Sequence, residues 1–212
     1  MRKSKAETAK TRETIVSIAS EAIRKRGIEA TGVAEIMAAA GLTHGGFYRH
    51  FDSKEKLVAE ALGMSRKDFV AGIRDAAQQG PEAVLKHFRD YATTGHRDDV
   101  GAGCALAANG SEIVRADAAT RHRATESFRT IFETAAPFMR AETGAAKTET
   151  AISLLTNMIG ALTIARMVDD PELSEKILDV TRRRIEKEIA VQPAKSRKKR
   201  EPRSSGVSGH RP

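Results

Sequence analysis

Aromatic residues are scarce in this chain of 212 residues: tryptophan is absent, and aromatic side chains make up 4% of the total. Segments in which apolar and polar residues alternate, as they do in half-buried strands, are also few. Alanine, leucine and isoleucine dominate the apolar set, and 40% of all residues are hydrophobic, which is enough for a sizeable core. These features favour an all-α protein over a sheet-rich one.

Cysteine is almost absent too, because Cys104 is the only one. A single cysteine excludes an internal disulfide and fits a reducing compartment. The basic residues 1–14 lack the apolar stretch of a secretory signal. The most apolar run, residues 151–168, is interrupted by polar residues such as Asn157 and Arg166, which suits a buried helix better than a membrane span. We therefore expect a cytoplasmic protein with no membrane contact.

Motifs of enzymes are missing as well. The chain has no HExxH zinc motif and no GxxxxGK[ST] phosphate loop, and "GAGCALAANG" at residues 101–110 lacks the third glycine and the preceding strand of a dinucleotide fingerprint. His96, Asp98 and Asp99 are of metal-ligand types, but three polar residues in one loop are usually solvated. We expect no enzyme, no metal site and no cofactor.

Positive charge gathers at the two ends of the chain, whose net charge is +8. Residues 1–56 carry 11 Lys and Arg against 7 Asp and Glu, residues 57–192 carry 18 against 20, and residues 193–212 carry 7 against 1. This split fits a protein that binds an anionic polymer near its termini and has a neutral body with another role. A soluble protein with a basic tail is the alternative.

Apolar residues at helical spacing predict a helix over residues 11–26, which Gly27 ends, and a second, two-turn helix over residues 33–40. A turn with Gly41 then leads to a third short helix over residues 43–50. Two short helices joined by a tight turn of this kind form the helix-turn-helix pattern. The pattern is moderately specific, because many small bundles contain a tight helix corner.

Capping residues define the next boundaries. Thr43 is placed to cap the third helix. At "DSKEKL", Asp52 or Ser53 provides the N-cap and Glu55 completes a capping box, which opens a longer fourth helix toward Gln78.

A glycine pair, Gly45 and Gly46, lies within the third short helix. Glycine lowers helix stability by about 1 kcal/mol per residue relative to alanine. We infer that something outside the chain requires bare backbone at this place.

Five further helices are predicted, giving about nine in all. Three of them begin at Pro81, Asp117 and Asp170. The other two cover residues 104–114 and 145–168. Residues 94–103, "TGHRDDVGAG", form a loop, and Pro137 disturbs the last turn of its helix. In the last helix the apolar stripe is Leu173, Ile177, Val180 and Ile189.

Three regions follow from these patterns. Residues 1–56 are predicted to form a helix-turn-helix DNA-binding domain, and residues 57–192 a larger helical domain. Residues 193–212, rich in Pro, Ser, Gly, Lys and Arg, are predicted to be a disordered basic tail that adds sequence-independent affinity for DNA.

The segment from Thr11 to Leu57, above all "AEIMAAAGLTHGGFYRHFDSKEKL", resembles the DNA-binding domain of the TetR family of bacterial transcriptional regulators. The Ala-Ala-Gly turn that ends at Gly41, the hydroxyl of Thr43, the Gly45 position, the aromatics Tyr48 and Phe51 and the Ser-Lys-Glu-x-Leu motif carry the resemblance. "GCALAANGSE", residues 103–112, is also similar to the start of the sixth helix in many members.

The resemblance implies a DNA-binding surface. In it His44 reads a base edge, Tyr48 and His50 reach phosphates, and Lys54 meets the backbone of the duplex, while Gly45 and Gly46 allow close approach. The full set of expected contact residues is Thr43, His44, Gly45, Gly46, Tyr48, His50 and Lys54. Many members carry Thr, Ser or Ala where this chain has Gly46, so one customary groove contact is missing. Recognition of the DNA sequence then depends more on His44 and on DNA shape.

The resemblance also implies that residues 57–192 form a helical ligand-binding and dimerisation domain, with a ligand cavity in it. Its expected lining is Phe69, Phe88, Tyr91, Cys104, Phe128, Phe132 and Met158. Asn109, His87 or Asn157 would supply polar groups. For each of these residues, packing in an ordinary core is the alternative.

The resemblance implies that the last two helices pack with those of a second subunit in a four-helix bundle. The helix over residues 145–168, which is apolar almost all round, supports this expectation. The implied function is a sequence-specific regulator, a repressor that binds a palindromic operator in double-stranded DNA as a homodimer. An unidentified small-molecule effector would release it by population shift.

Two alternatives remain open. The basic tail also fits a protein that compacts DNA without sequence preference. Cys104 lies at the start of a predicted helix, where the helix dipole favours a reactive thiolate, so a sensor of oxidants or electrophiles is a second alternative.

Overall fold

The structure, a computed structural model, describes residues 4–190. Within them it has nine α-helices, two short 3-10 helices and no strand beyond an isolated bridge between Met139 and Ile189, which confirms the all-α fold. The predicted tail, residues 193–212, lies outside the described residues. The elements are α1 (Lys5–Arg26), α2 (Val33–Ala39), η1 (His44–Arg49), α3 (Lys54–Gln79), α4 (Pro81–Tyr91), α5 (Thr94–Asp98), α6 (Ala105–Arg115), α7 (Ala118–Ala135), η2 (Ala136–Phe138), α8 (Gly144–Met167) and α9 (Pro171–Glu188).

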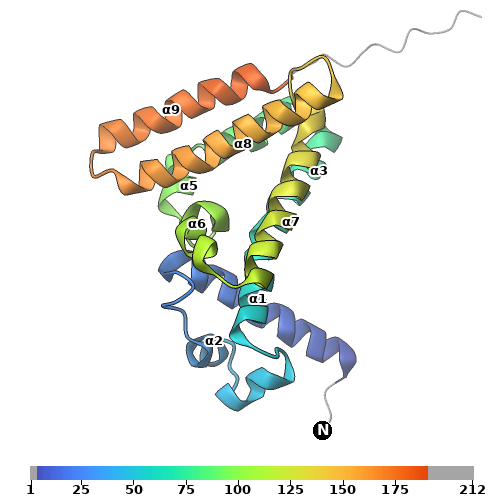
Figure 1. The fold of residues 1–212 in the computed structure, drawn as a ribbon, viewed down its shortest axis with the longest axis vertical. Coiled ribbons are helices and arrows are strands. Elements are labelled where there is room, and N and C mark those ends of the chain that lie inside the picture. Colours follow the sequence, from blue (N-terminus) through green and yellow to red (C-terminus); the bar gives the residue numbers. More distant parts are fainter. Residues whose placement is uncertain (1–3, 191–212) are drawn as a thin grey trace, which may run out of the picture.

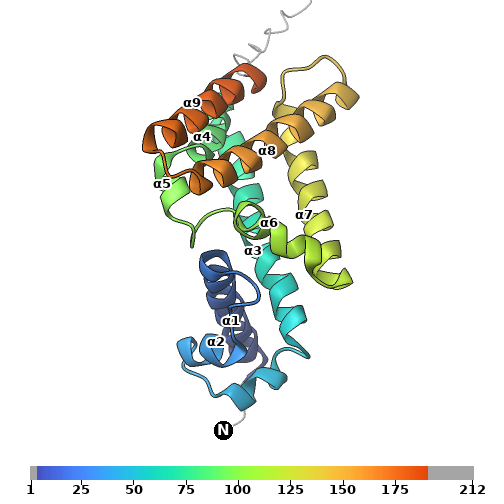
Figure 2. The ribbon, with the colours of Figure 1, turned by 60° about the vertical axis from the view of Figure 1, so that its left-hand side comes forward.

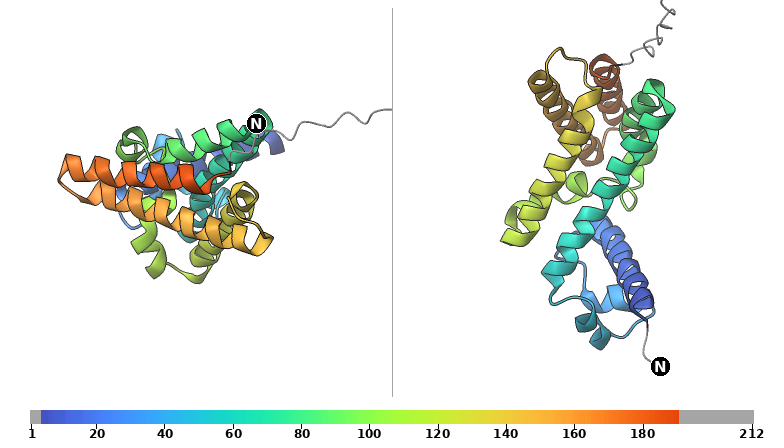
Figure 3. Two further views of the ribbon diagram at one scale, coloured as in Figure 1. Left: turned by 90° about the horizontal axis from the view of Figure 1, so that it is seen from above. Right: turned by 90° about the vertical axis from the view of Figure 1, so that its right-hand side faces the viewer.

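The helices form a small end and a larger part (Figure 1, Figure 2). α1, α2 and η1 make up the small end, and α8 and α9 lie side by side at the opposite end (Figure 3). α3 starts at the small end and continues into the larger part, where it packs along α7. The boundary predicted between residues 56 and 57 falls within the first turn of this helix and stays a prediction.

Apolar side chains from successive elements hold the small end together. α1 buries the face that its spacing predicts, and α2, η1 and the start of α3 pack against it. α1 begins at Lys5 and not at residue 11, because Ser4 and Glu7 form a reciprocal capping box. The buried set at this end is Ile15, Ala19, Ile23, Ile36, Met37, Phe47, Phe51 and Leu57.

The corner between α2 and η1 depends on glycine, as the sequence predicts. Gly41 has a φ of +69°, in the left-handed region, and Gly27, which ends α1, has a φ of +94°. A side chain in the left-handed region costs about 1–2 kcal/mol, whereas glycine adopts it freely.

The third element is a 3-10 helix and not the expected α-helix. Its hydrogen bonds span three residues: Gly46 N donates to Thr43 O at 3.0 Å, and His50 N donates to Phe47 O at 2.8 Å. Thr43 stands at its N-cap, but the hydroxyl makes no capping hydrogen bond, so the predicted side-chain cap is wrong. The physical reason is local, since two glycines in six residues weaken an α-helical turn.

The start of α3 also differs in detail. Ser53 is the N-cap, and its hydroxyl accepts a hydrogen bond from Lys56 N at 3.4 Å. Because the helix begins at Lys54, Lys56 and not Glu55 is its third residue. The capping box predicted with Glu55 is therefore wrong.

Two local differences mark the larger part. The stretch predicted as a loop, residues 94–103, contains the five-residue helix α5, which Thr93 caps by accepting from His96 N at 3.3 Å. α7 ends at Ala135 and passes into η2, which contains Pro137, as predicted.

The stripe predicted on α9 faces the core of its own chain only at its end, where Ile189 is fully buried. Within the helix, the buried residues lie one position further along: Ser174, Leu178, Thr181 and Ile185. Leu173 and Val180 of the predicted stripe are exposed, and Ile177 is half-buried. α9 therefore has a second apolar face that is left largely uncovered.

Candidate nucleic-acid interface and ligand cavity

The residues of η1 divide into an inner and an outer set. The Phe47 side chain is 1% exposed and stacks on Phe51, with 5.6 Å between the ring centroids. Tyr48, the next residue, is 68% exposed, and its ring meets Phe47 edge-on at 5.3 Å. Phe47 and Phe51 thus fix the element to the core, while Tyr48 projects into solvent.

The other predicted DNA-contact residues surround this ring. Thr43, His44 and Gly45 are exposed, and Gly46, His50 and Lys54 are half-buried. The Lys54 ammonium donates a hydrogen bond to the Glu29 carbonyl at 3.4 Å, so it has a partner within the chain. Contact with DNA stays a prediction for all seven residues.

Two arginines belong to this end although the sequence argument passed over them. Arg49 is exposed in the last turn of η1. Arg12 of α1 is half-buried, donates from Nε to the His50 carbonyl at 3.2 Å and lies 4.3 Å above the Phe51 ring. Its ion pair with Glu60 joins α1 to α3. Arg12 thus positions η1, and Arg49 adds a free cation to the outer set.

Neither glycine of the pair is required by the fold. Gly45 and Gly46 do not have positive φ. A Cβ atom on Gly45 would meet nothing within 4 Å, and one on Gly46 would make ordinary contacts of 3.7 Å with Met37 and Thr43. The chain itself would therefore accept side chains at both positions.

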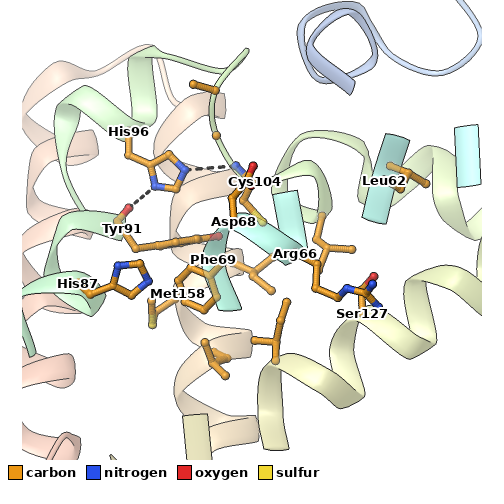
Figure 4. Close-up of a pocket in the computed structure, with 16 residues that line it drawn as sticks. Leu62, Arg66, Asp68, Phe69, His87, Tyr91, His96, Cys104, Ser127 and Met158 are labelled. Carbon is orange, nitrogen blue, oxygen red and sulfur yellow. Dashed lines mark hydrogen bonds between the residues drawn. The ribbon is translucent and has the colours of Figure 1, made fainter. Parts of the chain in front are cut away.

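A cavity of about 260 Å³ lies in the larger part (Figure 4). Helices α3, α4, α5, α6, α7 and α8 and the segment before α6 surround it. Of the predicted lining, Phe69, Tyr91, Cys104 and Met158 face it, together with the polar candidate His87. Leu62, Leu106, Ile131, Leu155 and Ile159 complete its apolar wall.

Three predicted aromatics do not line the cavity. Phe88 is fully buried behind the wall, and its ring meets Phe69 at 5.9 Å. Phe128 and Phe132 stack on each other, 5.8 Å apart, while their neighbours Ser127 and Ile131 face the cavity. A helix turns by about 100° per residue, so an error of one position moves a side chain off the wall.

The two asparagines lie elsewhere. Asn109 is buried, but its amide donates to the Ile23 carbonyl at 2.9 Å. Asn157 is exposed on α8.

Comparison with known proteins decides the family. A family model described as "Bacterial regulatory proteins, tetR family" matches residues 15–61. A TetR transcriptional regulator of Chloroflexus aurantiacus has the same fold, with a TM-score of 0.64 and 25% identity over 87% of this chain and 100% of that chain. Residues 15–61 of this chain belong to the TetR family of bacterial regulatory proteins.

Curated relatives match this chain over part of its length. The transcriptional repressor BepR of Brucella suis biovar 1 is 38% identical over 66 residues, 31% of this chain and 32% of that protein. The regulator TtgR of Pseudomonas putida is 40% identical over 62 residues, 29% and 30% of the two chains. The chain thus spans about a third of the length of the curated relatives it matches. Escherichia coli NemR in its reduced form shares the fold, with a TM-score of 0.71 and 18% identity over 87% of this chain and 99% of that one.

On the cavity wall, the His96 ring joins two backbone segments by hydrogen bonds, which the sequence did not reveal. Its Nδ1 lies 2.8 Å from the Tyr91 carbonyl, and its Nε2 lies 3.2 Å from the backbone N of Cys104, which donates (Figure 4). Burial lowers the pKa of the His96 ring, and burial lowers the pKa of His87 as well. Both rings are therefore uncharged at neutral pH, with Nδ1 of His96 as the donor. Among residues 4–190 no three His, Cys, Asp or Glu side chains are placed to hold a metal.

These lowered pKa values predict that acid destabilises the fold. Below pH 6.5 the unfolded chain takes up protons that folded His87 and His96 resist, so stability present above pH 6.5 is lost as the pH falls toward the folded pKa. We expect the urea midpoint of the whole chain to be lower at pH 5 than at pH 7.5. His96→Gln and His87→Phe should each reduce this difference, whereas His122→Gln, at an exposed site on α7, should keep it. If the difference between the urea midpoints at pH 5 and pH 7.5 were the same in all variants, His87 and His96 would not be its cause.

Proposed function

We propose that this protein is a transcriptional repressor that binds a palindromic operator as a homodimer and is released by a small molecule bound in the cavity. The observation that carries the proposal is the outer surface of η1: small and polar groups around an exposed tyrosine, fixed from behind by Phe47 and Phe51. An element of this kind can enter the major groove while keeping a fixed docking angle.

The glycine pair supports this role. Because neither backbone conformation nor packing calls for glycine at positions 45 and 46, the constraint comes from a surface outside the chain. Bare backbone lets N–H groups approach phosphates and base edges closely. Tyr48, Arg49 and Lys54 then supply phosphate contacts, and His44 the base-edge contact.

The uncovered side of α8 and α9 supports pairing of two subunits. Five of the seven large hydrophobic side chains exposed on the described part of the chain lie on these two helices: Ile152, Ile164, Met167, Leu173 and Val180. By length and composition α8 also meets the criterion for a membrane span. One such helix is weak evidence, and its Leu154, Met158 and Leu162 are buried in the core, so a second copy is the occupant proposed. The protein is proposed to be cytoplasmic and to bind no membrane.

The cavity wall is connected to the small end through hydrogen bonds. Arg24 of α1 donates from Nε to the Gly101 carbonyl at 2.5 Å, and Asn109 of α6 donates to the Ile23 carbonyl at 2.9 Å. Between these two contacts, the cavity is lined by Ala102, Gly103, Cys104 and Leu106. A ligand that displaces this segment therefore changes the seating of α1, and with it the spacing of two recognition elements.

Glu112 completes the connection. Its carboxylate accepts hydrogen bonds from the backbone N of Ile28 at 2.7 Å and of Glu29 at 3.1 Å, in the turn between α1 and α2. Gly27 has no side chain there, and a Cβ atom would collide with the carboxylate.

We expect Glu112→Ala to lower the free energy of unfolding by about 2 kcal/mol, since hydrogen bonds to a charged acceptor are worth about 1.5–3 kcal/mol each. Hydrogen exchange at the amides of Ile28 and Glu29 should accelerate. Arg115→Ala, at an exposed site on the same helix, is the matched control and should change neither quantity. Unaltered exchange in Glu112→Ala would show that the carboxylate does not join the two parts.

Selection of bound fragments from random double-stranded DNA tests the proposed function. A palindromic consensus with half-sites about one helical turn apart is expected. Binding without any consensus would favour the DNA-compacting alternative, and no binding would overturn both.

Release through the thiol is a second candidate, favoured by the position of Cys104 on the cavity wall between the charges of Arg24 and Arg166. A second assay measures whether a candidate effector releases the protein from the selected DNA. Comparing the original chain with Cys104→Ser in this assay separates the candidates. An effector that binds without covalent chemistry still releases this variant from DNA, whereas a thiol-reactive one does not.

A further inference from the structure

The cavity is an apolar chamber with few polar atoms on its wall. Its volume of about 260 Å³ exceeds the roughly 150 Å³ of a cavity known to hold benzene, so a molecule of two fused rings fits. The charged side chains that reach it, Arg66 and Asp68, are of opposite sign and follow one another closely on α3. The chamber thus has no net charge to attract an ion.

One buried acceptor on the wall, Nε2 of His87, has no hydrogen-bond partner among residues 4–190. The buried Tyr91 hydroxyl interacts with the Cys104 thiol, which is a weak hydrogen-bonding group. His87 and Tyr91 stand one turn apart on α4, so both project from the same face of the helix. Buried polar groups in folded proteins are normally hydrogen-bonded, and an orphaned acceptor in an apolar chamber points to a polar group on an occupant.

The hydrogen-bonding sense of His87 is set by its surroundings. The ring is hydrogen-bonded to the backbone of Phe69, and burial keeps it neutral by lowering its pKa. Since Nε2 has no partner, Nδ1 makes this bond as the donor, which leaves Nε2 as an acceptor. The ring also packs against Gly72, where a Cβ atom would collide with it, so it is held in place.

Two other polar side chains of the wall, His96 and Ser127, are already engaged. Both ring nitrogens of His96 are hydrogen-bonded to backbone, and the Ser127 hydroxyl donates to the Arg123 carbonyl at 2.9 Å. An occupant must therefore offer a hydrogen to His87 Nε2 and needs no charge. A hydroxyl group on an apolar frame meets this requirement, and a ketone or ether does not.

We infer that the cavity binds an uncharged aromatic or alicyclic molecule with a hydroxyl group, whose O–H donates to His87 Nε2. This inference rests on the proposed role of the cavity as the effector site and names the chemical class of the effector. Tyr91 provides a second hydrogen-bonding group for the same ligand.

Calorimetric titration of the full chain with 1-naphthol and with naphthalene, in the absence of DNA, tests the inference. We expect 1-naphthol to bind at least tenfold more tightly, because naphthalene leaves the buried acceptor unpaired. His87→Phe keeps a ring against Gly72 and should reduce the preference to about twofold or less. Tyr91→Phe should weaken naphthol binding by a smaller factor. His122→Phe, remote from the cavity, should keep the full preference.

Equal affinities for the two probes, or a preference that survives in His87→Phe, would overturn the inference, as would no binding of either probe to a chain that melts cooperatively. Melting curves of each variant show whether its fold is intact. Failure here is distinct from failure of the proposed function: a chain that selects a palindrome but ignores the hydroxyl refutes the ligand class alone. A chain that prefers naphthol but selects no DNA refutes the repressor role alone.

Discussion

A chain carrying both Ile164→Glu and Val180→Glu is expected to be a monomer at micromolar concentration and to bind the selected palindrome at least 100-fold more weakly. Both side chains are about half exposed, at 51% and 52%, on the uncovered side of α8 and α9. Pairing of two subunits would bury the introduced carboxylates without partners. A monomer engages one half-site at a time and so loses the factor of about 10²–10⁴ that a linked pair of contacts provides.

The control for this prediction is Val114→Glu. Val114 is 73% exposed, but it lies on α6 and not on the α8 and α9 pair. Light scattering should find Val114→Glu dimeric and the double variant monomeric. A double variant that remains dimeric would place the subunit interface elsewhere, and two monomeric variants would show that added charge acts without regard to position.

Gly45→Leu is expected to leave the fold intact and to weaken operator binding at least 100-fold. The position is exposed, lacks positive φ and has open space around a Cβ atom, so the free energy of unfolding should change by less than about 1 kcal/mol. In the proposed complex, however, a leucine side chain would occupy the space between η1 and the groove. Denaturation and fluorescence anisotropy with the selected DNA measure the two quantities.

Two glycine variants serve as controls. Gly110→Leu places the same side chain at an exposed site on α6 with open space around it, and it should alter neither stability nor DNA binding. Gly41→Ala should do the opposite of Gly45→Leu, with a loss of about 1–2 kcal/mol of stability, because Gly41 has positive φ. If Gly45→Leu binds the operator normally, η1 does not enter the groove by its first turn.

The ligand cavity shows how far sequence periodicity reaches. The resemblance indicated which helices surround it, and Phe69, Tyr91, Cys104 and Met158 do line it. Choosing aromatics by type failed for Phe128 and Phe132, because cavity lining depends on helix rotation and not on residue size. The orphaned acceptor of His87 depends on a backbone partner from another helix, Phe69, and no local pattern contains that information.

The sequence by itself determined the local features of this protein: the helical segments, the glycine corner at Gly41, the inward Phe47 and Phe51, and the outward Tyr48. These depend on φ preferences and on 3.6-residue periodicity, which act over a few neighbouring residues. Only the tertiary structure decided which face of α9 is covered, where Glu112 meets the turn after α1, and which side chains enclose the cavity. The physical reason is that these features arise from packing between helices distant in sequence, where small rotations of each helix select the side chains that meet.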